Sequence, residues 1–115
     1  MENVAYDALN ISYSFFVKCS PDDWYRIPIK TSTTADEAVA YRNSLSQESN
    51  PRIFYQSKAS FPDNTAPYIH CLPISDETLN RFTSGESMFD VQDKAKVELV
   101  KARENNLGYF GNEML

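Results

Sequence analysis

A chain of 115 residues in which 42% of the side chains are hydrophobic and 13% are aromatic has enough apolar surface to bury a core, which excludes an intrinsically disordered protein. Its net charge of -5 opposes binding to the phosphate backbone of nucleic acids. The sequence therefore predicts one folded domain over residues 1–115 with no direct nucleic acid partner.

The first elements predicted along the chain are two strands joined by a turn. Apolar residues occupy every second position from Ile11 to Val17, which predicts a half-buried strand over residues 11–18. Residues 19–23 favour a tight turn, and residues 24–31 resume the alternation as a second strand. Pro28 has no amide hydrogen, so we expect this second strand at a sheet edge or with a bulge.

A helix and two further strands follow. Thr33 or Thr34 can cap a helix that extends to about Gln47, because a hydroxyl accepts hydrogen bonds from the free amides of the first turn. After it we expect a short strand over residues 53–55, a polar loop over residues 57–67, and a strand over residues 68–74.

Two helices and an apolar tail complete the chain. Ser75 or Asp76 can cap a short helix to about Phe82, and residues 90–106 lack Pro and Gly and predict a longer helix. Within it, Asp90 with Lys94 and Glu98 with Lys101 are spaced to form ion pairs. The predicted fold class is α+β, with a small mixed or antiparallel sheet of about four strands, one helix after the first hairpin and two C-terminal helices.

The cysteines and the first residues indicate a cellular location. Residues 1–10 lack the basic and apolar segments of a signal peptide, and no apolar run is long enough to span a bilayer. Cys19 and Cys71 are too few for a disulfide-stapled secreted domain. We therefore expect a cytoplasmic protein with reduced thiols and no membrane partner.

A thiol enzyme that uses Cys19 or Cys71 with His70 is one alternative function, because an imidazole can activate a thiol. His70 and Cys71 are neighbours on a predicted strand, and neighbouring strand residues project to opposite faces. Only Cys19 could then meet His70, across strands, and Cys71 is expected in the core. The three residues lack a fourth ligand and the paired spacing of a zinc site, so we predict no metal and no other cofactor.

Arg42 stands in the apolar stripe of the first predicted helix, where a charge is unexpected. Its aliphatic stem can cover apolar surface while the guanidinium reaches water or a carboxylate. Alternatively, Arg42 and Tyr41 combine with Trp24 and Arg26 to hold a small anionic or nucleotide-like ligand by stacking and ion pairing. A binding domain for such a ligand is the second alternative function.

The last predicted helix has two apolar faces. One stripe contains Val91, Ala95, Leu99 and Ala102, and the other contains Phe89, Val97, Val100 and Leu107. A helix packed on one small core needs only one stripe. The second stripe must therefore contact the apolar tail of residues 107–115, another helix or the surface of another chain.

Acidic side chains are concentrated before and within that helix. Arg81 is the only basic residue between Ser75 and Asp93, so this segment has a local charge of about -4. Its carboxylates belong to Asp76, Glu77, Glu86, Asp90 and Asp93. Such acidic residues can simply be solvated at the starts of helices. They can also form a surface that steers a basic partner toward an aromatic anchor.

No motif in the sequence establishes a function, and the leading hypothesis is a small, acidic, non-enzymatic interaction protein that binds, and in this way inhibits, a protein partner. The steering charges would be the five carboxylates, and the apolar contacts would be Phe89, Val97, Val100, Tyr109 and Phe110. The partner is either a second copy, giving a homodimer, or a different protein with a basic surface. Phage-encoded and toxin-neutralising inhibitors share this size and charge, without any resemblance in sequence.

Overall fold

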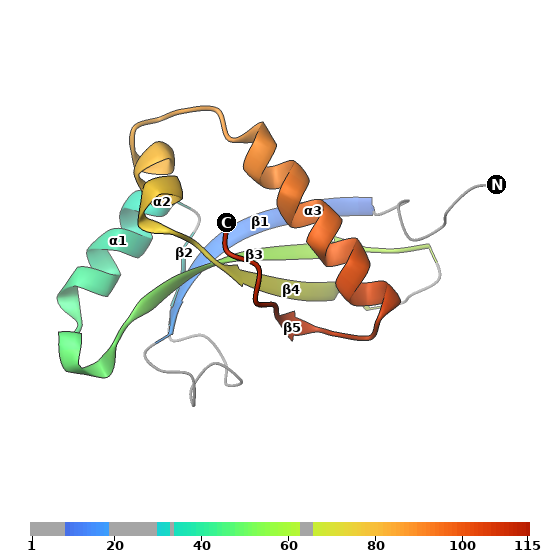
Figure 1. The fold of residues 1–115 in the computed structure, drawn as a ribbon, viewed down its shortest axis with the longest axis horizontal. Helices are drawn as coiled ribbons and strands as arrows, with labels where there is room; N and C mark the ends of the chain where they lie inside the picture. The colour runs from blue at the N-terminus through green and yellow to red at the C-terminus, as the bar shows by residue number, and fades with distance from the viewer. Residues whose placement is uncertain (1–8, 19–29, 33, 63–65) are drawn as a thin grey trace.

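The computed structural model describes residues 9–18, 30–32, 34–62 and 66–115 (Figure 1). The elements in chain order are β1 (Leu9–Lys18), β2 (Lys30–Ser32), α1 (Ala35–Ser44), the 3-10 helix η3 (Gln47–Ser49), β3 (Arg52–Ser60), β4 (Tyr68–Pro73), α2 (Asp76–Thr83), α3 (Phe89–Glu104) and β5 (Tyr109–Phe110). The turn predicted over residues 19–23 and most of the strand predicted over residues 24–31 lie outside the described residues.

The strands form one sheet in the order β2-β1-β3-β4-β5 (Figure 1). The first four strands pair antiparallel, and β5 adds to β4 in the parallel sense. The chain leaves β4, crosses through α2 and α3, and returns in the same direction, as a parallel pair requires. The predicted α+β class, the helix after the first strands and the two C-terminal helices are confirmed.

The polar loop predicted over residues 57–67 is wrong in its first part, because β3 continues to Ser60. This strand pairs with β1 on one side and with β4 on the other. Ser57 and Ala59 are buried, whereas Lys58 between them is exposed. The alternation of a strand therefore persists beyond Tyr55, but small and polar side chains carry it, so hydrophobic periodicity does not reveal it.

Hydroxyl caps begin the two shorter helices where the sequence predicts them. Thr34 Oγ1 accepts a hydrogen bond from Glu37 N at 3.2 Å before α1, and Ser75 Oγ accepts one from Thr78 N at 3.2 Å before α2. Helix α1 is shorter than predicted and ends at Ser44, after which η3 forms the remaining turn. Both caps fix where the helices start beside the sheet.

The three helices cover one face of the sheet and form the main core with it. Tyr13 stacks on Tyr55 with ring centroids 5.4 Å apart, and Phe15 meets Phe82 of α2 edge to face at 5.0 Å. Each such aromatic side chain contributes about 1.5–3 kcal/mol when it is fully buried. Side chains that alternate with the core residues along the strands project to the other face of the sheet. A smaller cluster there contains Phe54, Cys71, Ile69 and Phe110.

Candidate functional site

Helix α3 buries the first of its two predicted apolar stripes. Val91, Ala95, Leu99 and Ala102 are all buried. The second stripe does not form one exposed face. Phe89 and Val97 are 72% and 40% exposed, and Leu107 beyond the helix is 61% exposed, but Val100 is completely buried. Val100 therefore belongs to the folded interior and is not available to contact a partner, contrary to the prediction.

The second half of α3 packs against residues at the end of β3. Arg103, three residues after Val100, lies on the same side of the helix, and its guanidinium carbon stands 4.2 Å from the centroid of the Phe61 ring. Phe61 follows β3 directly and is itself buried with Leu99. Side chains at the end of β3 and directly after it therefore contact this part of α3.

The apolar tail folds largely onto its own molecule. Phe110 of β5 meets Phe54 edge to face with ring centroids 5.5 Å apart. Leu115 is buried in the main core, and its backbone donates to Pro73 O at 2.9 Å and accepts from Ser75 N at 2.8 Å. Tyr109 lies in β5, but its side chain is outside the described set. The tail leaves Leu107 and Met114 as its exposed large apolar side chains among the described residues.

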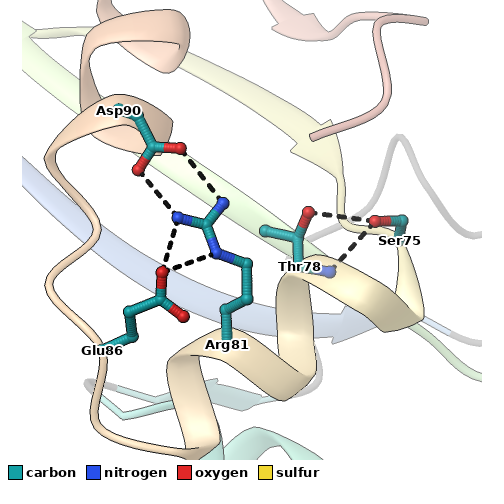
Figure 2. A network of polar contacts seen from close by, with 5 residues as sticks. All are labelled: Ser75, Thr78, Arg81, Glu86 and Asp90. Carbon is teal, nitrogen blue, oxygen red and sulfur yellow. Dashed lines mark hydrogen bonds and ion pairs between the residues drawn. The ribbon is translucent and has the colours of Figure 1, made fainter.

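Arg81 of α2 ties together two of the five predicted steering carboxylates (Figure 2). Its Nε and Nη2 donate to Glu86 Oε1 at 3.1 and 2.9 Å, and its Nη1 and Nη2 donate to the two Asp90 oxygens at 3.1 and 3.2 Å. The hydrogen bonds that Arg81 donates to Asp90 lower the pKa of the Asp90 carboxyl group. The predicted pairing of Asp90 with Lys94 is absent, since Lys94 donates to Met114 O at 3.0 Å instead.

The other three carboxylates are spread over α2 and α3. Asp76 Oδ1 lies 3.8 Å from Arg42 Nη1, and Glu77 and Asp93 are exposed. Asp93 is close enough to Tyr13 to add to the rise in the tyrosine pKa that burial causes. The predicted pair of Glu98 with Lys101 forms at 3.4 Å. The acidic segment is thus partly neutralised by arginine and partly solvated.

His70 and Cys71 project to opposite faces of β4, as the strand geometry predicts. Cys71 packs with Phe54 and is 1% exposed, and its thiol reaches Gln56 Oε1 at 3.9 Å. Burial raises the pKa of this thiol strongly, which opposes the thiolate form. His70 is 5% exposed on the face that α3 covers, and burial lowers its pKa. The structure therefore keeps these two side chains apart, while Cys19 lies outside the described residues.

Of the predicted ligand-binding residues, Arg42 and Tyr41 lie on α1, whereas Trp24 and Arg26 are outside the described residues. Arg42 lines an open groove of about 910 Å³ that Tyr41 does not line. The groove lies between α1, η3, the start of β3 and α2. Its lining consists of Val39, Arg42, Asn43, Gln47, Asn50, Pro51, Arg52, Ile53, Ile74, Ser75, Asp76, Leu79, Asn80, Thr83 and Met114.

Most of this groove was not predicted from the sequence. Asn50 stands in the short connection after η3 and Arg52 is the first residue of β3, and neither belongs to a motif that would set it apart in the sequence. The single available signal was the charge of Arg42 in an apolar stripe. A smaller pocket of about 290 Å³ lies by His70, Glu98 and Phe110.

Among the residues that the structure describes, no three His, Cys, Asp or Glu side chains are grouped closely enough to hold a metal ion. Within the same residues, no helix has the length and the apolar character needed to cross a membrane. No protein family model, curated protein or solved structure matches this chain.

Proposed function

We propose that this protein is a non-enzymatic interaction protein that binds a protein partner through exposed residues of α3, with Phe89 at the centre. One observation carries the proposal. The large apolar side chains that remain exposed among the described residues, Phe89, Val97, Leu107 and Met114, all belong to α3 or to the segment after it. Exposed large apolar side chains, and aromatic ones above all, are enriched at protein interfaces.

Phe89 is the best candidate for the central contact. It is 72% exposed at the first residue of α3, and an aromatic ring there can enter a pocket on a partner at a small entropic cost. The exposed carboxylate of Asp93 lies about one helical turn from it, and Glu86 and Asp90, which share Arg81, leave a net negative charge beside it. A partner that accepts the ring would therefore be stabilised by basic residues around the pocket.

The same charges favour a different protein over a second copy. A symmetric dimer through this surface would bring identical patches together, and so would place carboxylates near their own copies. Like charges across an interface oppose association. A basic partner avoids this repulsion, and inhibition would follow if the covered surface were one that the partner uses.

Binding can be tested by immobilising the protein and capturing partners from an extract of the cells that produce it. Each captured protein is then purified and titrated by calorimetry against the wild type and Phe89→Ala. We expect the variant to bind at least about 30-fold more weakly, as truncation of a central aromatic contact usually does. The control, Lys58→Ala, changes an exposed residue of β3 and should bind like the wild type.

The electrostatic part of the proposal is tested separately by the rate of association. Added salt and the variant Asp93→Asn should each slow association with the same partner, because both weaken the attraction between opposite charges. Equal affinities of Phe89→Ala and wild type for every purified partner would overturn the role of α3.

A further inference from the structure

The groove between α1 and α2 contains two arginines whose hydrogen-bond donors are unused. Arg42 has its closest carboxylate in Asp76 at 3.8 Å, which is too long for a hydrogen bond. Arg52 makes no ion pair and no side-chain hydrogen bond within the described part of the chain. Arg81 shows the contrast, because Glu86 and Asp90 occupy its donors.

Two unsatisfied guanidinium groups in one groove are unexpected in an acidic protein. The chain has a net charge of -5, yet the described residues that line this groove include two arginines and one carboxylate, that of Asp76. The side chain of Arg42 is only 26% exposed, so water does not fully compensate its charge. The groove is therefore a locally positive site that an anion can enter.

We propose that this groove binds the phosphate monoester of a small polar metabolite, such as a sugar phosphate or a nucleoside monophosphate, with Arg42 and Arg52 on the phosphate. A phosphate monoester carries a charge of about -1.5 to -2 at neutral pH, so it balances the charge of two guanidinium groups better than a single carboxylate does. Arginine also pairs with phosphate oxygens through two parallel N–H donors.

The rest of the groove is suited to the polar part of such a ligand. Asn43, Asn50 and Asn80 place side-chain amides along it, and each amide both donates and accepts hydrogen bonds, as hydroxyl groups and base edges require. Buried Ile53 and Leu79 add apolar surface at its base. A volume of about 910 Å³ lies within the range of small-molecule sites.

Asp76 would compete with the ligand for the guanidinium group of Arg42. Its side chain is 94% exposed, so the ion pair with Arg42 is weak and costs little to break. An entering phosphate would replace this carboxylate at the guanidinium. Removal of the Asp76 charge should therefore strengthen binding, whereas removal of either arginine charge should weaken it.

The test is a titration of the full chain, labelled with ¹⁵N, by adenosine monophosphate, glucose 6-phosphate and inorganic phosphate, with adenosine and glucose as neutral counterparts. We expect saturable shifts of groove amides with at least one ester and none with the neutral compounds. Arg42→Gln and Arg52→Gln should each weaken ester binding about 10-fold or more. Lys58→Gln, which removes the same charge elsewhere, should leave the affinity unchanged.

Asp76→Asn keeps the test decisive if an arginine variant fails to fold, because the change lies at an exposed position and should tighten ester binding about 2- to 5-fold. No saturable shift with either ester would overturn the proposal, as would equal affinities of all charge variants. Inorganic phosphate that binds as tightly as both esters would overturn the role of the amide side chains.

Discussion

His70 is the single histidine of the chain, and it is 5% exposed on the face of β4 that α3 covers. Burial lowers the pKa of the imidazole, and the negative charge of Glu98 opposes this shift only in part. The Nδ1 atom is buried and has no hydrogen-bond partner within the described part of the chain. The folded protein therefore favours the neutral ring, because a protonated ring would be poorly compensated there.

We predict that mild acid destabilises the protein through His70. The folded pKa lies below the unfolded value of about 6.5, so the unfolded state binds more protons in the window below that pH. The contribution of the neutral ring is fully present above about pH 6.5 and is lost as the pH falls toward the folded pKa, by at most about 1.4 kcal/mol per pH unit.

Urea denaturation of the wild type and His70→Gln, at about pH 7.5 and about pH 5.5, measures this loss. The wild type should lose more free energy of unfolding than the variant between the two conditions. A carboxylate that titrates in the same window affects both proteins equally, so the difference between them isolates His70. Identical losses in both proteins would contradict the prediction.

Some residue roles follow from local patterns, and others depend on partners that the pattern does not show. Val91 and Leu99 are buried as helical periodicity predicts. Val100 of the other stripe is buried as well, although helical periodicity does not place it on the core-facing side. Likewise, the spacing allows Asp90 to pair with Lys94. In the structure, Asp90 instead accepts two hydrogen bonds from Arg81.

At the scale of elements, β5 and the residue after it require a glycine for close packing. Gly111 N donates to Cys71 O at 2.9 Å, which holds the chain against β4. A Cβ atom at Gly111 would stand 2.6 Å from His70 Nε2 and 2.7 Å from Leu72 Cδ2. Both of these side chains are buried, so neither can move aside without disturbing the core.

Gly111→Ala should therefore lower the free energy of unfolding by about 1–3 kcal/mol, the usual cost of overpacking a core. Gly108→Ala is the matched control, because a Cβ there would have Tyr68 Oη as its nearest neighbour at 3.5 Å, an ordinary contact. The control should be neutral or gain up to about 1 kcal/mol from the reduced freedom of the unfolded chain. Denaturant unfolding compares the two, and equal stabilities would contradict the packing account.

Elements with strong local signals were predicted close to their observed bounds. The hydroxyl caps at Thr34 and Ser75 mark the helix starts, and the uninterrupted segment after Met88 forms α3. The second half of β3 and the two residues of β5 lack such signals. They become strands because a neighbouring strand supplies hydrogen-bond partners, and this depends on tertiary contacts that one segment does not contain.

For the whole molecule, the fold class follows from the order of elements, but the candidate sites do not. The groove takes its lining from α1, η3, β3, α2 and the C-terminal segment, which meet only once the sheet is covered. Arg52 and Asn50 are candidate binding residues because these elements meet at the groove, and not because of their sequence context. The charge of the acidic segment, in contrast, is plain in the sequence. Its pairing with Arg81 is not, because the loop between α2 and α3 brings the carboxylates to the arginine.

The main core is complete only when residues from both ends of the described chain meet. Leu115 is 7% exposed and packs in the same cluster as Phe15 of β1 and Leu79 of α2. Its backbone bonds to Pro73 and Ser75 hold the segment across the end of β4, and Figure 1 shows this segment turning back over the sheet from β5. The side chain thus closes the core between the sheet and the helices.

Leu115→Ala should consequently lower the free energy of unfolding by about 2–4 kcal/mol, because it removes buried methyl groups and leaves a cavity. Leu107→Ala makes the same chemical change at a position that is 61% exposed and should cost less than about 0.5 kcal/mol. Denaturation of both variants under one condition gives the comparison. If the tail were only a loosely attached interface segment, the two substitutions would cost about the same. A large difference would instead show that the tail is part of the folded core, and that only its exposed side chains are available to a partner.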